Sequence, residues 1–153
     1  MSKISTAYDD IISELDTLFP NKTRLFNSYS ITDNPVHIVR DGYGLRYLGA
    51  NLSGDSEYCK SFNDEHLFEV VFTYEYVRTE QQLTPFDDGN KDLMESAFIT
   101  RQRLYRPDKL GDALNIEDVV IGSTTGIVEF LVGKNRFISL TVSFTIKIKE
   151  DFL

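Results

Sequence analysis

The fold is decided by residues 136–149, which read Arg136-Phe137-Ile138-Ser139-Leu140-Thr141-Val142-Ser143-Phe144-Thr145-Ile146-Lys147-Ile148-Lys149. Apolar side chains alternate in this stretch with small polar or cationic ones. Successive side chains of a β-strand point to opposite faces, so the alternation predicts one long strand whose apolar groups all lie on a core face. Such a strand buries its apolar face only against other elements, and we therefore expect a sheet covered by helices.

The composition is that of a globular protein with a core. The chain has 153 residues, 41% of them hydrophobic, which suits one domain over residues 1–153. A formal net charge of −8 disfavours tight binding along a nucleic-acid backbone, because such binding depends on cationic side chains. The single cysteine, Cys59, excludes an internal disulfide, and no apolar stretch approaches the roughly 20 residues that cross a bilayer. We expect a protein of a reducing cytoplasm, without a secretion signal or a membrane span.

Two segments have the periodicity of amphipathic helices. The first is Thr6–Phe19, where Thr6 and Asp9 form a capping signal and the following proline stops the helix. The second is Leu93–Arg106, also followed by a proline. The segment between the first helix and the first strand, Asn21–Asn34, has no sustained period and is interpreted as a connector.

A β-hairpin is predicted near the middle of the first half. Val36–Arg40 and Tyr43–Leu48 flank Asp41-Gly42, a pair that favours a two-residue type I′ turn because both positions need positive φ. The polar segment Gly49–Asp64 follows. It is long for a connection inside a compact domain, and loops of that length are commonly functional or mobile.

A second long strand, Leu67–Thr79, repeats the alternation of the first, with an aromatic-rich apolar face. Asp108–Asp118 is interpreted as a loop or one short helical turn, and Val119–Ile121 as a short strand. The residues on the apolar face of the second long strand are Phe68, Val70, Phe72, Tyr74 and Tyr76.

A closing hairpin joins Ile127–Val132 to the long last strand through the turn at Gly133–Arg136. A four-residue loop would place Glu129 opposite Leu140 on the core face, so we expect a loop of three or five residues. That loop opposes apolar residues to one another: Val132 with Ile138, Phe130 with Leu140 and Val128 with Val142. Together the elements predict an α+β fold, a mostly antiparallel β-sheet with two helices packed on one face and a long C-terminal β-hairpin.

The metal-binding and nucleotide-binding patterns are incomplete. His37, Cys59 and His66 lie on separate predicted elements, without the spacing of a zinc site. Gly42-Tyr43-Gly44 is not the glycine pattern of a dinucleotide site and is better explained by the hairpin turn. An acidic run resembles the opening of a calcium loop but lacks the required glycine, so a helix N-cap is the favoured interpretation. That run comprises Asp88, Asn90 and Asp92.

Catalytic and nucleic-acid patterns are equally incomplete. Glu69 and Glu75 are interpreted as solvated sheet charge rather than as an acid–base pair. The aromatic row Phe68, Phe72, Tyr74 and Tyr76 has no interleaved lysine or arginine, which favours core packing over a platform for single-stranded nucleic acid. We therefore assign no catalytic, cofactor-binding or metal-binding residue, and we expect a protein that is not an enzyme and uses no cofactor.

The order of elements resembles that of the tail-terminator (tail-completion) proteins of tailed bacteriophages. The family is defined by shape and size, so the resemblance implies a fold and a role and no particular binding residue. The segments that carry the resemblance are Ala7–Phe19, Asp41–Arg46, Phe68–Tyr76, Leu93–Tyr105 and Phe137–Lys149.

The resemblance implies a structural virion protein, assembled in the host cytoplasm and located at the neck of the tail. Copies would form a homo-oligomer, a hexameric ring that caps the tail tube and lets DNA pass through its centre. Its partners would be the tail tube protein, the neck or connector protein and, where present, the sheath. The alternatives are another head–tail connector or baseplate component and, from a different class, a small cytoplasmic ligand-binding α+β domain with a concave pocket.

Overall fold

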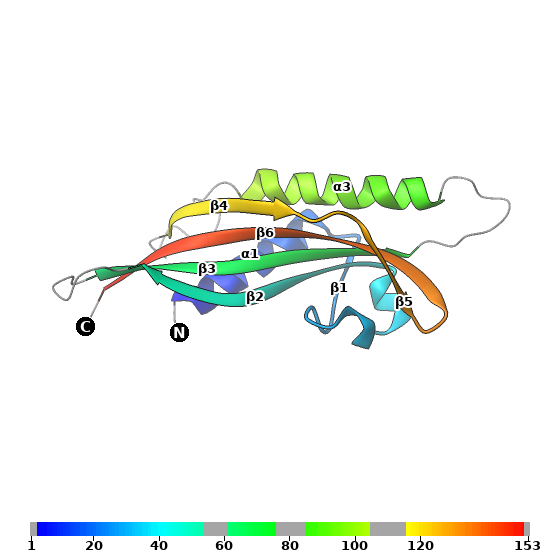
Figure 1. Ribbon diagram of the computed structural model, residues 1–153, viewed down its shortest axis with the longest axis horizontal. Helices are drawn as coiled ribbons and strands as arrows, with labels where there is room; N and C mark the ends of the chain where they lie inside the picture. The colour runs from blue at the N-terminus through cyan, green and yellow to red at the C-terminus, as the bar shows by residue number, and fades with distance from the viewer. Residues whose placement is uncertain (1–2, 54–60, 76–84, 105–115, 152–153) are drawn as a thin grey trace.

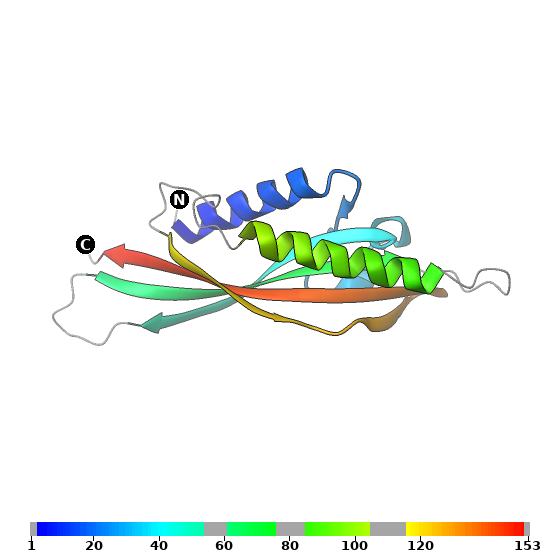
Figure 2. The same ribbon diagram turned by 90° about the horizontal axis from the view of Figure 1, so that it is seen from above.

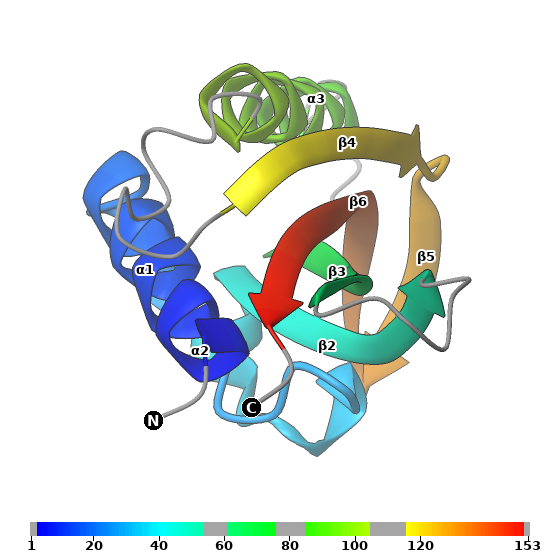
Figure 3. The same ribbon diagram turned by 90° about the vertical axis from the view of Figure 1, so that its left-hand side faces the viewer.

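The computed structural model describes residues 3–53, 61–75, 85–104 and 116–151. It confirms the predicted α+β fold, with one mixed, mostly antiparallel six-stranded sheet and helices packed against it (Figure 1). The two long helices, α1 (Lys3–Leu18) and α3 (Pro85–Leu104), contribute to one hydrophobic core. Figure 3 looks along the long axis and shows them on two adjacent sides of the twisted strands.

The sheet has the strand order β1-β2-β3-β6-β4, and β5 also pairs with β6. Among the strands that the structure describes, only β1 and β2 pair in parallel. Two short helical segments, η1 (Ile31–Asp33) and α2 (Val36–Val39), precede β2. The strands are β1 (Thr23–Arg24), β2 (Asp41–Ser53), β3 (Ser61–Glu75), β4 (Ile116–Thr124), β5 (Val128–Val132) and β6 (Asn135–Asp151).

The last strand, β6, is the axis of the sheet, as its sequence predicts. One of its edges pairs with β3 from Phe137 to Asp151, and its other edge pairs with β4 and β5 in turn. Its six predicted core residues are all buried, and the Phe144 ring stacks on Phe68 at a centroid distance of 5.5 Å. These six residues are Ile138, Leu140, Val142, Phe144, Ile146 and Ile148.

The two faces of the sheet differ in their cover. The helix face packs on α1 and α3, which bury Ile11 and Leu93 completely. The opposite face, called the outer face below, is covered at one end only, by a second hydrophobic cluster. In the part of the chain that the structure describes, nothing covers the outer face at the other end, where Leu67 is 40% exposed. The second cluster consists of Leu25, Ile38, Val39, Val71, Val132 and Phe137.

The predicted hairpin at Asp41-Gly42 is wrong. Val36–Val39 form the helix α2, and Asp41 and Gly42 are the first residues of β2, which pairs with β3. Pro35 begins the helical turn, since its carbonyl accepts hydrogen bonds from two following backbone amides. Gly42 serves close packing rather than a turn, because a Cβ there would lie 2.7 Å from Thr73 Oγ1.

The closing hairpin is shorter than predicted. β5 and β6 are joined by Gly133 and Lys134 alone, with Gly133 at φ 61°, and Val132 pairs with Asn135. Phe130 therefore lies opposite Phe137, and their rings stack at 5.5 Å. The prediction of a three- or five-residue loop is wrong because it assumed one apolar face, whereas β5 packs into the second cluster on the outer face.

Helix boundaries also differ from the sequence prediction. α1 begins at Lys3, so Thr6 and Asp9 lie inside the helix and do not cap it. α3 begins at Pro85, a residue that the first helical turn accepts because its missing N–H has no partner there. The acidic run at residues 88–92 lies inside α3, so the N-cap interpretation is wrong as well.

Two predicted connections contain regular structure, and one predicted strand is longer than expected. β2 extends to Ser53 and β3 starts at Ser61, so the predicted loop Gly49–Asp64 is mostly strand. The connector Asn21–Asn34 contains β1 and η1, and the short strand at Val119–Ile121 belongs to the longer β4. Residues 54–60, 76–84 and 105–115 lie outside the described residues, and with them fall Cys59, Tyr76 and most of the predicted loop Asp108–Asp118. None of the helices described here combines the length and apolar character of a membrane span.

Candidate functional site

The outer edge of β2 is the margin of the sheet that faces away from β3. β1 pairs with this edge only at Gly42 and Tyr43. At Tyr47 the backbone of this edge bonds to a side chain instead of a strand. The Tyr47 amide donates to the Tyr29 hydroxyl at 2.9 Å, and that hydroxyl donates to the Tyr47 carbonyl at 3.3 Å. From Leu48 to Ser53, no strand in the described ranges pairs with this edge. An edge of this kind is a template for another strand.

A β-bulge changes the direction of β2 where the open stretch begins. The pairing with β3 shifts between Tyr47 and Gly49, and Gly49 adopts a φ of 111°, which favours glycine. Leu48 in the bulge is 45% exposed. Gly49 lies opposite Leu67 and has no side chain to cover it, so Leu67 is exposed as well, and Leu48 and Leu67 are together called the leucine pair below.

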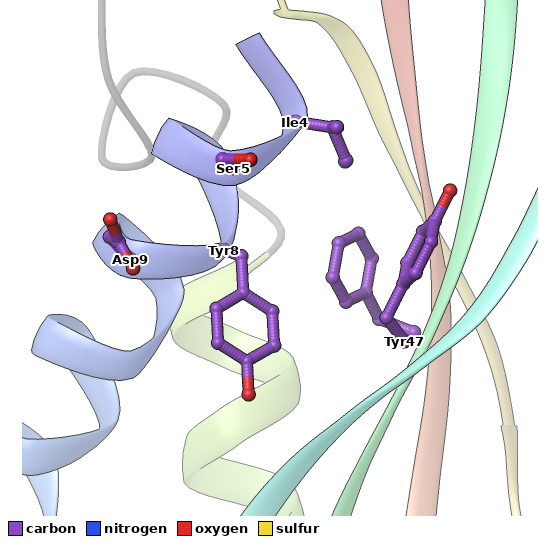
Figure 4. Close-up of a pocket in the computed structure, with 6 residues that line it drawn as sticks. Ile4, Ser5, Tyr8, Asp9 and Tyr47 are labelled. Atoms are coloured by element: carbon purple, nitrogen blue, oxygen red, sulfur yellow. The ribbon is translucent and has the colours of Figure 1, made fainter. Parts of the chain in front are cut away.

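A cavity of about 360 Å³ lies on the helix face beside the same edge (Figure 4). Tyr8 extends from α1 and Tyr47 from β2 toward the space between helix and strand. Their rings lie 6.4 and 5.3 Å from the ring of Phe68, which closes the cavity from β3. This lining suits an apolar side chain or a small apolar group. The residues that line it are Ile4, Ser5, Tyr8, Asp9, Tyr47 and Phe68.

A buried histidine forms a hydrogen bond with the hydroxyl of Tyr47. The Tyr47 hydroxyl and His66 Nδ1 are 2.9 Å apart, and His66 is 5% exposed. Burial lowers the pKa of His66, and the carboxylate of Asp64, 3.6 Å from Nε2, opposes this shift. The imidazole is therefore neutral at pH 7, and its role is to orient Tyr47.

The segment before α2 presents two exposed aromatic side chains, of which Tyr29 bonds to the backbone of β2 at Tyr47. Phe26 is 76% exposed and Tyr29 is 60% exposed. A buried amide holds this segment in shape, since Asn34 Oδ1 accepts from the Asn27 amide and Asn34 Nδ2 donates to the Asn27 carbonyl, both at 2.8 Å. The sequence did not predict this surface, because the segment has no hydrophobic period. The available signal was the pair of asparagines, since asparagine side chains often hydrogen-bond to the nearby backbone and shape a turn.

An ion cluster fixes the start of β2 to α3. Lys22 Nζ lies 2.5 Å from Asp41 and 2.7 Å from Asp92, and the lysine side chain is 8% exposed. Burial acts to lower the pKa of Lys22, but hydrogen bonds from the ammonium to the two carboxylates outweigh it and raise the pKa. The cluster has a structural role, because all three groups are used in holding the elements together.

The residues considered as metal ligands in the sequence are not brought together at one site. His37 is exposed on α2, His66 is buried in β3, and Cys59 falls outside the described residues. Within the ranges that the structure covers, no group of three or more His, Cys, Asp or Glu side chains could hold a metal ion.

The residues weighed for catalysis or stacking lie apart from the β2 edge or inside the core. Glu75 accepts a hydrogen bond from Arg40 at 2.9 Å, and Glu69 is half-buried on the outer face. Phe68 and Phe72 are fully buried, which confirms core packing for these two rings.

The comparisons with known proteins give no family. No protein-family model matches the chain, and a search of curated proteins finds no significant match. The open edge of β2, its flanking cavity and its exposed leucine pair therefore carry the functional argument.

Proposed function

We propose that the protein is a structural virion component, a tail terminator whose copies form a ring that caps the phage tail tube and joins it to the head–neck connector. The observation that carries the proposal is the pair of margins of one long sheet, β2 at one side and β4 with β5 at the other. Apart from β1, no further strand of the described residues pairs with these margins. A ring joins the two margins of neighbouring copies by repeated head-to-tail contacts, which removes the exposed edges.

The shape of the sheet supports this role. β6 has 17 residues, which corresponds to roughly 55 Å at about 3.3 Å per residue. A compact domain of this size has a radius of gyration of only about 15 Å. The sheet is accordingly drawn out along one axis, as Figures 1 and 2 show. Long, narrow subunits present most of their backbone edge to side-by-side neighbours.

The charge supports a ring through which DNA passes without being held. With a formal net charge of −8, the chain offers weak attraction to phosphate, so DNA would move past it freely.

The test is assembly. Light scattering across a concentration series, followed by negative-stain imaging, should reveal closed rings, and isolated tail tubes mixed with the protein should acquire a cap at one end. A protein that stays monomeric alone and in the presence of tail tubes and neck proteins would remove the proposal.

A second candidate, a small ligand-binding domain, is favoured by one observation. The cavity between α1 and β2 has a volume of about 360 Å³, within the roughly 300 to 1,000 Å³ of typical ligand pockets. A thermal-shift screen with small aromatic and aliphatic molecules tests it. A ligand that raises the unfolding temperature of the parent and leaves that of Tyr8→Ala unchanged would support this candidate over the ring.

A further inference from the structure

The open stretch of β2 has backbone groups directed outward, ready for an added strand. The amide and carbonyl of Tyr47 point outward, because both bond to the Tyr29 hydroxyl. Tyr47 pairs with Phe68, and Ala50 pairs with His66 two residues along β3. Hydrogen-bonding direction alternates along an antiparallel strand, so Ala50 has the same outward direction as Tyr47.

This edge also offers apolar contacts on both of its faces. The cavity beside Tyr47 opens on the helix face. Leu67 of the leucine pair lies exposed on the outer face. A strand added here would place alternate side chains in the cavity and on the leucine pair, which is how edge-binding strands gain both affinity and specificity.

β5 has the features of a strand that fits this edge. It is five residues long, and of the strands described it pairs only with β6, so its far edge is open. Val128 and Leu131 are 58% and 57% exposed. They are three positions apart in the strand and therefore lie on opposite faces of β5. Each face of β5 thus presents one exposed aliphatic side chain, as the β2 edge requires.

The two surfaces cannot meet within one molecule. β5 and the carboxyl end of β2 lie toward opposite ends of the long axis (Figures 1 and 2). Charge also favours contact between copies, since Lys134 is exposed at the hairpin turn next to β5 and Asp9 lies at the cavity. Opposite charges at these places attract until salt screens them.

We infer that β5 of a second copy of this chain adds to the outer edge of β2 between Leu48 and Ser53, with Leu131 in the cavity lined by Tyr8, Tyr47 and Phe68. Val128 then meets the Leu48–Leu67 pair. The contact is head-to-tail, because each copy uses a different surface as donor and as acceptor. This inference specifies the contact between neighbouring subunits of the proposed ring. It rests on the proposed function, which supplies the second copy.

Two variants separate the donor from the acceptor. Leu131→Asp places a charge on the donor strand, where the cavity would have to desolvate it. Ala50→Pro removes an outward N–H from the acceptor, and proline is tolerated on an edge strand whose N–H faces outward. Both positions are exposed, and circular dichroism and unfolding midpoints check that both variants fold. Leu48→Asp is a second acceptor variant in case proline perturbs the strand.

Native mass spectrometry and light scattering then measure the assemblies. We expect each variant alone to be monomeric at concentrations where the parent forms rings, with association at least about tenfold weaker. An equimolar mixture of Leu131→Asp and Ala50→Pro should form a dimer and stop there, because the mixture contains one intact donor and one intact acceptor. Met94→Asp, at an equally exposed apolar position on α3, is the matched control and should assemble like the parent.

The outcomes separate this inference from the proposed function. If both variants form rings like the parent, another surface joins the copies, which overturns the inference and leaves the ring intact. A mixture that stays monomeric also overturns it, because a head-to-tail contact must be restored. If the mixture of variants forms dimers but the parent protein never binds tail tubes, the result would support the inference and refute the tail-terminator role. A parent that is monomeric throughout would refute both.

Discussion

Gly89 of α3 lies directly against the ring of Tyr74 in β3. A Cβ at position 89 would stand 2.9 Å from Tyr74 Cδ1 and 3.0 Å from the side chain of Ile138. Glycine inside a helix is about 1 kcal/mol less favourable than alanine, yet here it lets α3 approach the sheet. We therefore predict that Gly89→Ala destabilises the fold by about 1 to 3 kcal/mol, because the overpacked side chains must shift.

Urea unfolding measures this loss, and Gly126→Ala is its control. A Cβ at position 126 would meet nothing within 4 Å, so this substitution should change stability by no more than about 0.5 kcal/mol. Equal effects of the two substitutions would mean that α3 does not approach the sheet as closely as described.

The core face of β6 predicts a large asymmetry between two substitutions on the same strand. Phe144 is fully buried and stacks on Phe68, so Phe144→Ala should cost about 3 to 5 kcal/mol. Thr141 lies half-buried on the outer face, and Thr141→Ala should cost less than about 1 kcal/mol. Denaturant titrations at unchanged m-value decide this, and a similar loss from both would contradict the assigned faces.

The ion cluster at Lys22 should contribute more stability than a surface pair. Lys22→Met leaves Asp41 and Asp92 without their shared cation, and we expect a loss of about 1 to 3 kcal/mol, since both carboxylates keep some solvent. Lys147 lies 3.8 Å from Glu65 in an exposed pair, so Lys147→Met should change stability by less than about 1 kcal/mol. Thermal unfolding of both variants at low and high salt provides the comparison.

Stability should fall at alkaline pH because of Tyr43. Burial and the hydrogen bond to Asp16 raise the pKa of Tyr43 from 10.0 to about 12. The folded state keeps a proton that the unfolded state releases, so this contribution is complete below pH 10 and is lost as the pH rises toward 12. The loss is on the order of 1 to 3 kcal/mol. Unfolding free energies measured from pH 9 to 12 should fall less steeply in Tyr43→Phe.

His66 predicts the opposite behaviour in weak acid. Burial lowers its pKa below the usual 6.5, so the unfolded state takes up a proton first. The corresponding stability is present above pH 6.5 and is lost as the pH falls through the lower pKa of the folded state. Replacing His66 with Gln should flatten the stability profile between pH 7 and 5.

The sequence predicted those elements whose apolar period is continuous. β6 and the core face of β3 follow a strict two-residue alternation, and α1 follows a helical one, so each was assigned the correct type. The first half of α3 was missed because polar residues and Gly89 interrupt its period there. Its helical state depends on packing against the sheet, which local sequence does not reveal.

The candidate site was beyond sequence reasoning for a physical reason. Val36–Val39 and Tyr43–Leu48 both have strand character, and only the tertiary structure decides that the first becomes helix and the second joins β3. The cavity combines Tyr8 with Tyr47 and Phe68, which three different elements supply. The second cluster likewise packs Phe130 and Phe137 on the outer face. A prediction that gives the last strand a single apolar face leaves this outer face to solvent.

The central place of β6 has a consequence for synthesis on the ribosome. Every other strand of the sheet precedes β6 in the chain, and three of them, β3, β4 and β5, pair with it directly. A nascent chain that ends before residue 135 therefore holds β3 with one edge unpaired and with Phe68 lacking its stacking partner. Such long-range pairing slows folding and leaves adhesive edges exposed in the meantime, so chaperone capture should be strongest until β6 has left the exit tunnel.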